Sequence, residues 1–276
     1  MPPGTPVFKK VDSRLKGNVA AELKAIPHQH SLVVPAIPEF GRLTRNGRIL
    51  GFGIAEPIDI AARLGRHAGA AIIPDIESVH DIDAALMQQH DLVVGARGLA
   101  DRLARKMATA DQVPELALPA AAVYCVIGST DPITLTQLRH LRGTFPGLTD
   151  IRAPNGEAGT YDGLPSRLTL LQATRGSSPA TGKAVAMALG ASLKQLSPPP
   201  NALLVLSGGA TAQVILGMMG IEVLELMGEV LAGLPIARAG SLTVVTKSGG
   251  FGGPDTLSRL LRPYLSVGSP DQSHVR

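Results

Sequence analysis

Cysteine and tryptophan are nearly absent from this chain, and their scarcity excludes several classes of protein. Cys125 is the single cysteine among 276 residues, and there is no tryptophan. One thiol can form neither an internal disulfide nor a cysteine-based metal cluster, so a disulfide-rich secreted fold and a cysteine zinc site within the chain are both excluded. This composition is typical of a reducing compartment, and we expect a cytoplasmic location.

Aromatic residues and one-sided charge are also scarce. Three tyrosines and five phenylalanines make up 3% of the chain, and 26 Lys and Arg residues oppose 22 Asp and Glu residues, giving a net charge of +4. Nucleic-acid binding needs a basic surface and, for single strands, aromatic side chains that stack on bases, so we expect no nucleic-acid partner. The small positive excess suits small anionic ligands instead.

Long hydrophobic runs are missing as well. No segment comes near the length of apolar sequence that a membrane span needs, and the first ten residues contain no apolar stretch of the kind found in signal peptides. We therefore expect no membrane span and no membrane partner. Hydrophobic residues nevertheless make up 45% of the chain, which is enough to form a large buried core.

Short apolar runs alternate with amphipathic segments along the sequence. Such alternation predicts an α/β fold with largely parallel sheets flanked by helices. A stretch without clear periodicity, residues 110–119, divides the chain, so we predict two domains, residues 1–118 and 119–276; residues 143–167 are predicted to be an irregular surface excursion. The predicted strands cover residues 32–37, 70–73, 92–94, 123–127, 168–173, 203–206 and 242–246, and the predicted helices cover 18–26, 82–89, 99–107, 132–141, 181–196, 211–219 and 256–261.

One pattern occurs three times in the second half: an apolar strand, a turn of small residues and then a helix. The turns cover residues 128–132, 207–211 and 247–253. Glycine lets the backbone approach a ligand, and the N–H groups at the start of a helix favour an anion. Each turn follows the carboxyl end of a predicted strand, and ligands of open parallel sheets bind at the carboxyl ends of the strands. We therefore predict phosphate binding here, with Lys247 near the phosphates. The alternative is that these are ordinary connections, with Asp131 capping a helix that begins at Pro132.

The first half contains a dense polar cluster at residues 9–18, in which four cations surround Asp12. Such a loop can hold a substrate carboxylate through charge-assisted hydrogen bonds while Asp12 orients or deprotonates a hydroxyl group. We predict Asp12 as the catalytic residue, with Lys10, Arg14 and Arg42 guiding the carboxylate. The alternative is a solvated loop in which Asp12 or Ser13 caps the next helix.

Several common catalytic motifs are missing from the sequence. The seven histidines are scattered without H-E-x-x-H spacing, so no metal-binding residue is predicted. No serine lies in a G-x-S-x-G elbow, and Gly51-Phe52-Gly53 lacks the third glycine of a dinucleotide-binding motif. The sequence therefore disfavours a hydrolase of the common type and a nicotinamide-dependent oxidoreductase.

Seven stretches of the chain, taken in order, resemble the four-carbon acid sugar kinase family. The most specific are Ser-Gly-Gly-x-Thr-Ala from Ser207 and Thr-Lys-Ser-Gly-Gly-Phe-Gly from Thr246. The resemblance implies an N-terminal domain that binds the sugar acid and a C-terminal domain that binds ATP. The seven stretches are residues 9–13, 35–42, 95–99, 128–137, 207–212, 229–235 and 247–252. The resemblance places Ser129, Gly208, Gly209, Thr211 and Gly249 at nucleotide-binding positions, and we add Ala210, Lys247 and Gly250 from the same turns.

The chain also departs from the family's pattern. Members of the family open with an Asp-Asp-x-Thr-Gly loop that helps build the sugar-acid site, whereas these residues contain no Asp-Asp dipeptide. We therefore expect a first domain that is incomplete at its N-terminus, and low turnover. Arg14 also stands where the family usually has threonine, Lys16 where it usually has arginine, and Ala210 where it usually has an acidic residue.

The resemblance implies an ATP-dependent kinase that phosphorylates a hydroxyl group of a small, four-carbon sugar acid, with Mg²⁺ bridging the phosphates. The alternative is a non-catalytic relative that binds the nucleotide or the sugar acid without turnover. In either case the expected partners are ATP and a small anionic sugar acid. A symmetric homodimer is the commonest assembly of such proteins and is our expectation for this chain.

Overall fold

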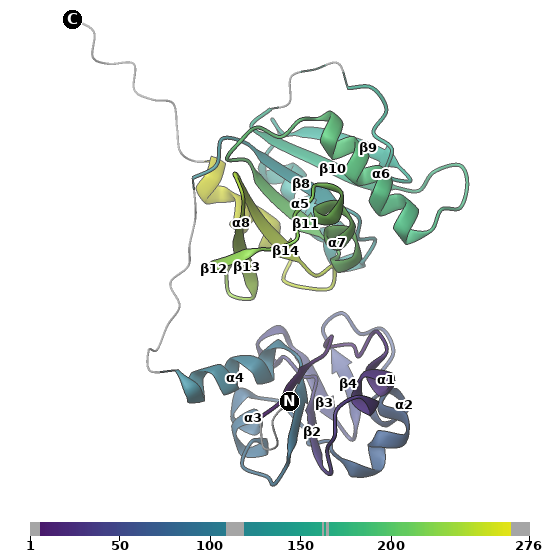
Figure 1. Cartoon of the computed structure of the whole chain (residues 1–276), viewed down its shortest axis with the longest axis vertical. Helices are drawn as coiled ribbons and strands as arrows, with labels where there is room; N and C mark the ends of the chain where they lie inside the picture. The colour runs from purple at the N-terminus through teal and green to yellow at the C-terminus, as the bar shows by residue number, and fades with distance from the viewer. Residues whose placement is uncertain (1–5, 109–118, 162, 164–165, 266–276) are drawn as a thin grey trace, which may run out of the picture. The chain divides into compact units, whose positions relative to one another are not determined.

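The computed structural model describes residues 6–108, 119–161, 163 and 166–265, and the chain divides into two compact units, Met1–Asp111 and Gln112–Arg276 (Figure 1). The predicted division between residues 118 and 119 borders residues 109–118, which lie outside the described residues. Each unit is an α/β structure, which confirms the predicted fold class. Within the described residues, no helix is both long and apolar enough to cross a membrane.

The first unit is built on a four-stranded parallel sheet with the strand order β1-β7-β2-β6. Alternate side chains of β2 face opposite sides: Val33 packs against α1 and α2, while Leu32 and Val34 pack against α3 and α4. The sheet therefore carries a core on each face. The elements are β1 (Phe8–Lys10), α1 (Val19–Lys24), β2 (Ser31–Val34), α2 (Ile60–Leu64), β6 (Ala71–Ile72), α3 (Val79–Ala85), β7 (Leu92–Gly95) and α4 (Arg97–Met107), with 3₁₀ turns at Pro38–Phe40 and Gly65–Ala70.

A small antiparallel sheet, β3-β4-β5, lies in the same unit and has no counterpart in the sequence prediction. Strands β3 (Arg42–Arg45) and β4 (Arg48–Gly51) are joined by Asn46 and Gly47, which have φ values of 48° and 68°. Positive φ at both positions of a two-residue hairpin turn is the conformation that Asn-Gly favours. Strand β5 (Ile58–Asp59) completes this sheet.

The second unit is built on a seven-stranded sheet with the order β12-β13-β14-β11-β8-β10-β9. Five neighbouring strands, from β14 to β9, are parallel, and β13 and β12 extend the sheet in antiparallel pairing. The elements are β8 (Val123–Ile127), α5 (Pro132–Thr144), β9 (Thr149–Pro154), β10 (Leu168–Thr174), α6 (Gly182–Gln195), β11 (Leu203–Ser207), α7 (Gly209–Met218), β12 (Glu225–Leu231), β13 (Leu234–Ala239), β14 (Leu242–Lys247) and α8 (Thr256–Leu265).

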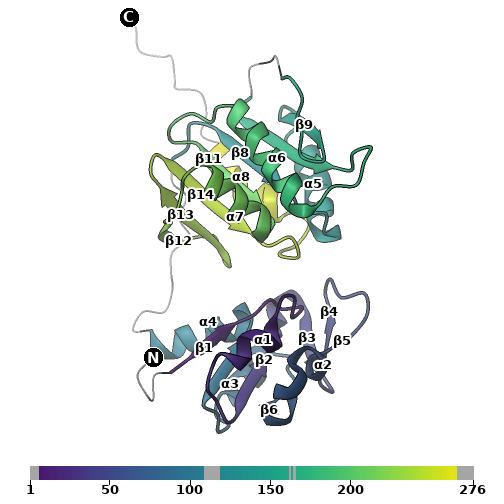
Figure 2. The same cartoon turned by 45° about the vertical axis from the view of Figure 1, so that its right-hand side comes forward.

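Helices cover both faces of the larger sheet. Val123, Cys125 and Ile127 of β8 pack in the cluster that includes α5 and α8, whereas Tyr124 and Val126 pack with α6 and α7. In Figure 2, α6 and α7 lie in front of this sheet and α8 lies behind it. Because β8 is buried on both faces, its sequence is apolar without alternation, which is typical of a central parallel strand. The helix starts that follow β8, β11 and β14 are therefore held by a rigid, doubly covered sheet.

Candidate functional site

The three glycine-containing turns lie side by side at the carboxyl ends of β14, β11 and β8, because these three strands are parallel neighbours in the larger sheet. We refer to this end of the sheet as its carboxyl edge. Backbone hydrogen bonds join the turns directly. Gly128 N donates to Ser207 O over 3.2 Å, and Gly208 N donates to Lys247 O over 2.9 Å. The structure thus brings together Ser129, Gly208, Gly209, Ala210, Thr211, Lys247, Gly249 and Gly250, the residues predicted to bind the nucleotide.

Two of these glycines are needed for the close packing of the turns. A Cβ atom on Gly128 would collide with Thr211 Oγ1, and a Cβ atom on Gly249 would collide with Ser129 Oγ. Glycine at these positions therefore lets neighbouring backbones approach one another.

Helix α7 begins in the middle of this edge and is open at its N-terminus. Gly208 is the N-cap residue with a φ of 106°, and no described side chain caps the helix through a hydrogen bond. A Cβ atom on Gly209, the first helical residue, would meet nothing within 4 Å. An uncapped helix N-terminus with open space beside its first residue is well suited to an anion, because its N–H groups and dipole favour negative charge.

Helix α5 begins differently. Asp131 Oδ1 accepts a hydrogen bond from Ile133 N over 3.0 Å, and the helix starts at Pro132. The predicted cap of α5 by Asp131, with Pro132 as the first helical residue, is therefore present. A carboxylate already occupies the N-terminus of α5, so α7 is the better anion site of the two.

Lys247 lies under the third turn and is only 2% exposed. Its Nζ donates to Ser248 O over 2.9 Å and lies 3.5 Å from Gly249 O. Burial lowers the pKa of the Lys247 ammonium group from its ordinary 10.5 to about 8, and the charge of Asp131 opposes this shift. The ammonium group predicted to lie near phosphates is thus bonded to carbonyl groups of its own turn.

The lowered pKa of Lys247 predicts a pH-dependent stability. Between pH 8 and 10.5 the folded protein releases this proton while the unfolded chain keeps it, so the free energy of unfolding rises with pH, by up to about 3 kcal/mol. Urea unfolding of the wild type and Lys247→Met at several pH values measures this. We expect the rise in the wild type and its loss in the variant; equal slopes would contradict the buried cation.

The first unit gathers its predicted residues at the carboxyl edge of its own sheet. Asp12 follows β1, and its Oδ1 accepts a hydrogen bond from Arg14 N over 2.8 Å. Strand β1 is held to β7 at this point, because Val11 N donates to Gly95 O over 2.9 Å. Burial lowers the pKa of the nearby Lys10 ammonium group; Asp12 opposes this shift and Lys9 adds to it. Asp12, Lys10 and the Arg14 backbone are thus neighbours at this edge.

Arg42 lies in the same region but is turned into the protein. Its side chain is 4% exposed; Nη1 donates to Ser13 Oγ over 2.6 Å, and Nε and Nη2 donate to Phe52 O over 3.1 and 2.9 Å. The guanidinium group therefore links the loop that contains Asp12 and Ser13, called the Asp12 loop below, to Phe52, the residue that follows the β3-β4 hairpin. Contact between Arg42 and a substrate carboxylate stays a prediction, whereas its role in holding this loop is visible in the structure.

Replacement of Arg42 should destabilise the first unit. Arg42→Met leaves the Phe52 carbonyl and the buried Ser13 hydroxyl without this donor, and we expect a loss of about 2–4 kcal/mol in the free energy of unfolding. Arg45→Met is the matched control: it lies on the same strand, with a half-exposed side chain paired to Glu77, and should cost less than about 1 kcal/mol. Equal losses in urea unfolding would contradict the linking role of Arg42.

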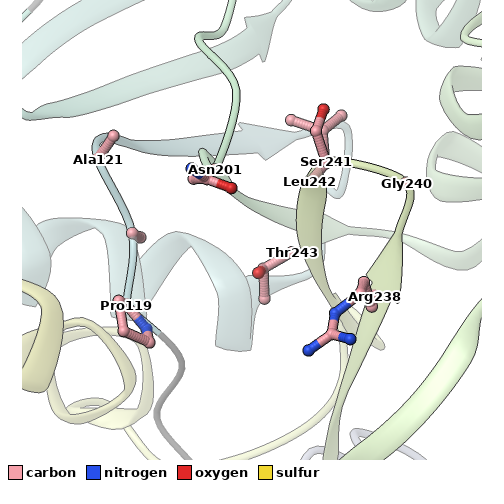
Figure 3. A pocket seen from close by; sticks show the side chains of 9 residues that line it. Pro119, Ala121, Asn201, Arg238, Gly240, Ser241, Leu242 and Thr243 are labelled. Carbon is pink, nitrogen blue, oxygen red and sulfur yellow. The ribbon is translucent and has the colours of Figure 1, made fainter.

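A cavity of the second unit lies away from these turns. It has a volume of about 560 Å³ and is lined by the chain before β8, β11 and β14, at the amino edge of the sheet (Figure 3). Arg238, Asn201 and Thr243 are among its lining residues. None of the residues predicted to bind a nucleotide lines it, so we do not assign it to the candidate site.

Among the described residues there is no group of three or more His, Cys, Asp and Glu side chains that could hold a metal ion. Asp131 is a carboxylate at the glycine turns, and it is engaged as a helix cap. A hydrated Mg²⁺ held mainly by nucleotide phosphates would fit this edge, because such an ion needs few protein ligands.

Two protein-family models match separate parts of the chain. A sugar-binding N-terminal domain model matches residues 3–58, and a nucleotide-binding C-terminal domain model matches residues 159–257; together the two ranges cover more than half of the chain. The chain belongs to the four-carbon acid sugar kinase family. In this family member the nucleotide-binding match includes the start of α7 and the turn after β14, and the sugar-binding match includes the Asp12 loop.

Two curated relatives are sugar-acid kinases. The chain is 27% identical to a D-threonate kinase of Bordetella bronchiseptica, over 92% of this chain and 76% of the relative. It is 28% identical to a 3-oxo-tetronate kinase of Methylobacterium radiotolerans, over 75% of this chain and 56% of the relative. A solved structure from Salmonella typhimurium LT2 shares the fold, with a TM-score of 0.62, 17% identity, and coverage of 94% of this chain and 81% of that one. These kinase relatives support a sugar-acid kinase in general.

Proposed function

We propose that this protein is an ATP-dependent kinase that phosphorylates a hydroxyl group of a four-carbon sugar acid. The observation that carries the proposal is the open N-terminus of α7, which lies inside the range that matches a nucleotide-binding domain. Its strand, β11, lies between β8 and β14, whose own turns follow at the same ends. The match of the Asp12 loop to a sugar-binding domain supports the acceptor half of the reaction. A sugar acid is negatively charged, which suits the cations around Asp12.

The second unit would bind ATP through its phosphates. The N–H groups at Gly209, Ala210 and Thr211 would donate hydrogen bonds to the phosphate oxygens, and Ser129 and the Gly249-Gly250 turn, which pack against each other, would border the same space. Mg²⁺, bound through the phosphates, would supply neutralisation of their charge. The lysine beneath the third turn, Lys247, adds a positive charge behind the backbone without needing to touch the nucleotide.

The first unit would present the acceptor. The hydroxyl oxygen attacks the γ-phosphorus of ATP, the bond between that phosphorus and the β,γ-bridging oxygen breaks, and the hydroxyl proton passes to the Asp12 carboxylate. Lys10 and Arg14 would attract the substrate carboxylate, and Arg42 would hold the Asp12 loop. Catalysis would thus consist mainly of positioning and charge neutralisation.

The names of the relatives, D-threonate kinase and 3-oxo-tetronate kinase, refer to two different four-carbon acids and support this substrate class. We therefore propose a four-carbon acid as the acceptor without choosing between them. A homodimer and a cytoplasmic location stay predictions.

Calorimetry with ATP and ADP, followed by ADP-release assays with a panel of four-carbon sugar acids, tests the proposal. We expect both nucleotides to bind and ADP release to depend on an added acid. Nucleotide binding without acid-dependent release would favour a non-catalytic binding protein, and no nucleotide binding by the folded protein would refute the proposal.

A further inference from the structure

The turn after β14 is held in place by side chains from a helix more than a hundred residues earlier in the sequence. Thr134 Oγ1 of α5 donates to Gly249 O over 2.8 Å, and Gln137 Nε2 donates to Phe251 O and Gly253 O, each over 2.9 Å. Thr134 and Gln137 are three residues apart and therefore lie on one face of α5. Both side chains are fully buried.

These hydrogen bonds fix the direction of the carbonyl groups in a segment rich in glycine. Glycine allows a peptide plane to adopt several orientations, and a flipped plane would direct a carbonyl oxygen toward a bound phosphate, which it repels. Lys247 completes the arrangement, because its Nζ donates to Ser248 O over 2.9 Å. Four carbonyl groups of this turn, at Ser248, Gly249, Phe251 and Gly253, are thus engaged by side-chain donors of the protein.

Gln137 is also unusual because it is a polar side chain that is fully buried beside apolar residues. It neighbours Leu138 and Leu141 on a helix packed against the apolar core that contains α8. Its Oε1 has no hydrogen-bond partner among the described residues, so the amide is buried with half of its polar capacity unused. Burial of an amide without full pairing costs free energy that an apolar side chain would avoid. The two hydrogen bonds from Nε2 to the turn offset this cost.

We propose that Thr134 and Gln137 are positioning residues of the nucleotide site, which keep the carbonyl groups of the turn after β14 directed away from the phosphates of ATP. The proposal rests on the proposed function, because it needs ATP to bind at this edge. It assigns α5 a role in nucleotide affinity: Gln137 acts through the turn, and Thr134 acts through the turn and through Ser129, whose Oγ lies 3.3 Å from Thr134 Oγ1.

Matched variants separate positioning from general stability. Thr134→Val keeps the shape of the side chain and removes the donor, whereas Thr134→Ser keeps the donor. Gln137→Met removes both Nε2 bonds at similar length. Ser192→Ala is the control, because Ser192 Oγ donates to Gly156 O over 2.9 Å in the same unit, is 4% exposed, and does not touch the turn.

Calorimetry with ATP and urea unfolding should be measured on all five proteins. We expect Thr134→Val and Gln137→Met to weaken ATP binding by about fivefold or more, the typical effect of one to two lost hydrogen bonds. Thr134→Ser should stay within about twofold of the wild type, and Ser192→Ala should lose stability with unchanged ATP affinity. The affinity for the sugar acid should not change in any variant.

The outcomes distinguish the two proposals. A wild type that does not bind ATP would refute the proposed function. A wild type that binds ATP, together with a folded Thr134→Val or Gln137→Met of unchanged affinity, would overturn the positioning role while the proposed function stands. The same holds if Ser192→Ala weakens ATP binding as much as Thr134→Val does, because the effect would then follow stability alone.

Discussion

Gly209→Val should weaken ATP binding at least about tenfold while leaving the second unit folded. A Cβ atom at this position meets nothing within 4 Å, and Gly209 lies outside the left-handed region, so the fold can accommodate a side chain. This open space adjoins the first residue of α7, next to the N–H groups where we propose that the phosphates bind. A valine side chain there would occupy the space that we propose for the phosphates, and it would not need to displace atoms of the protein.

Gly182→Val is the matched control for this change. Gly182 is the first residue of α6, as Gly209 is of α7, and a Cβ atom there also meets nothing within 4 Å. Thr181 caps α6 through its side chain, so that helix start is already occupied. Calorimetry should give wild-type affinity for Gly182→Val. Gly249→Val is a less specific test, because its side chain would also collide with Ser129. Unchanged ATP affinity in folded Gly209→Val would refute the assignment of α7.

Asp12→Asn should lower kcat by about a hundredfold or more, with a much smaller change in KM for the sugar acid. Asn can still accept the hydrogen bond from Arg14 N through its side-chain oxygen, so the loop keeps its conformation. What the substitution removes is the carboxylate that receives the proton of the attacking hydroxyl group. The loss should therefore appear in the chemical step and not in binding.

Asp91→Asn provides the control for Asp12. Asp91 lies before β7, at the opposite edge of the same sheet, and its carboxylate accepts hydrogen bonds from Gln29 N and His30 N. It is a carboxylate with a purely structural set of contacts, so its replacement should leave kcat within about twofold. Steady-state kinetics with both variants decides the matter: a kcat for Asp12→Asn near that of the wild type would exclude Asp12 as the base.

The fold was predictable where strands are buried on both faces. All seven predicted strands and all seven predicted helices are present, because runs such as residues 123–127 and 203–206 are apolar throughout. Strands at the margins were missed. β9 alternates Asp150 and Arg152 with buried residues, and β12 carries Glu225, so neither has a continuous apolar signal. The hairpin of β3 and β4 had a clear signal, the Asn46-Gly47 turn, that the prediction did not use.

The candidate site was predictable only as far as local pattern reaches. Strand, turn and helix in sequence place Gly208 and Gly249 at one sheet edge, since parallel strands end together. The directions of the Lys247 and Arg42 side chains depend on carbonyl groups and on burial that no local pattern reveals. The contacts of Thr134 and Gln137 with a turn about 115 residues away are tertiary and required the structure.

Phosphorus NMR of a reaction containing the protein, ATP, Mg²⁺ and each of several four-carbon sugar acids is the most direct test of ATP-dependent phosphorylation. Even slow turnover accumulates product over a long incubation. The proposed function predicts a new phosphoester resonance with one of the acids and an equal amount of ADP, both absent without the acid. ATP that binds but stays intact with every acid, or is hydrolysed to inorganic phosphate regardless of the acid, would contradict it.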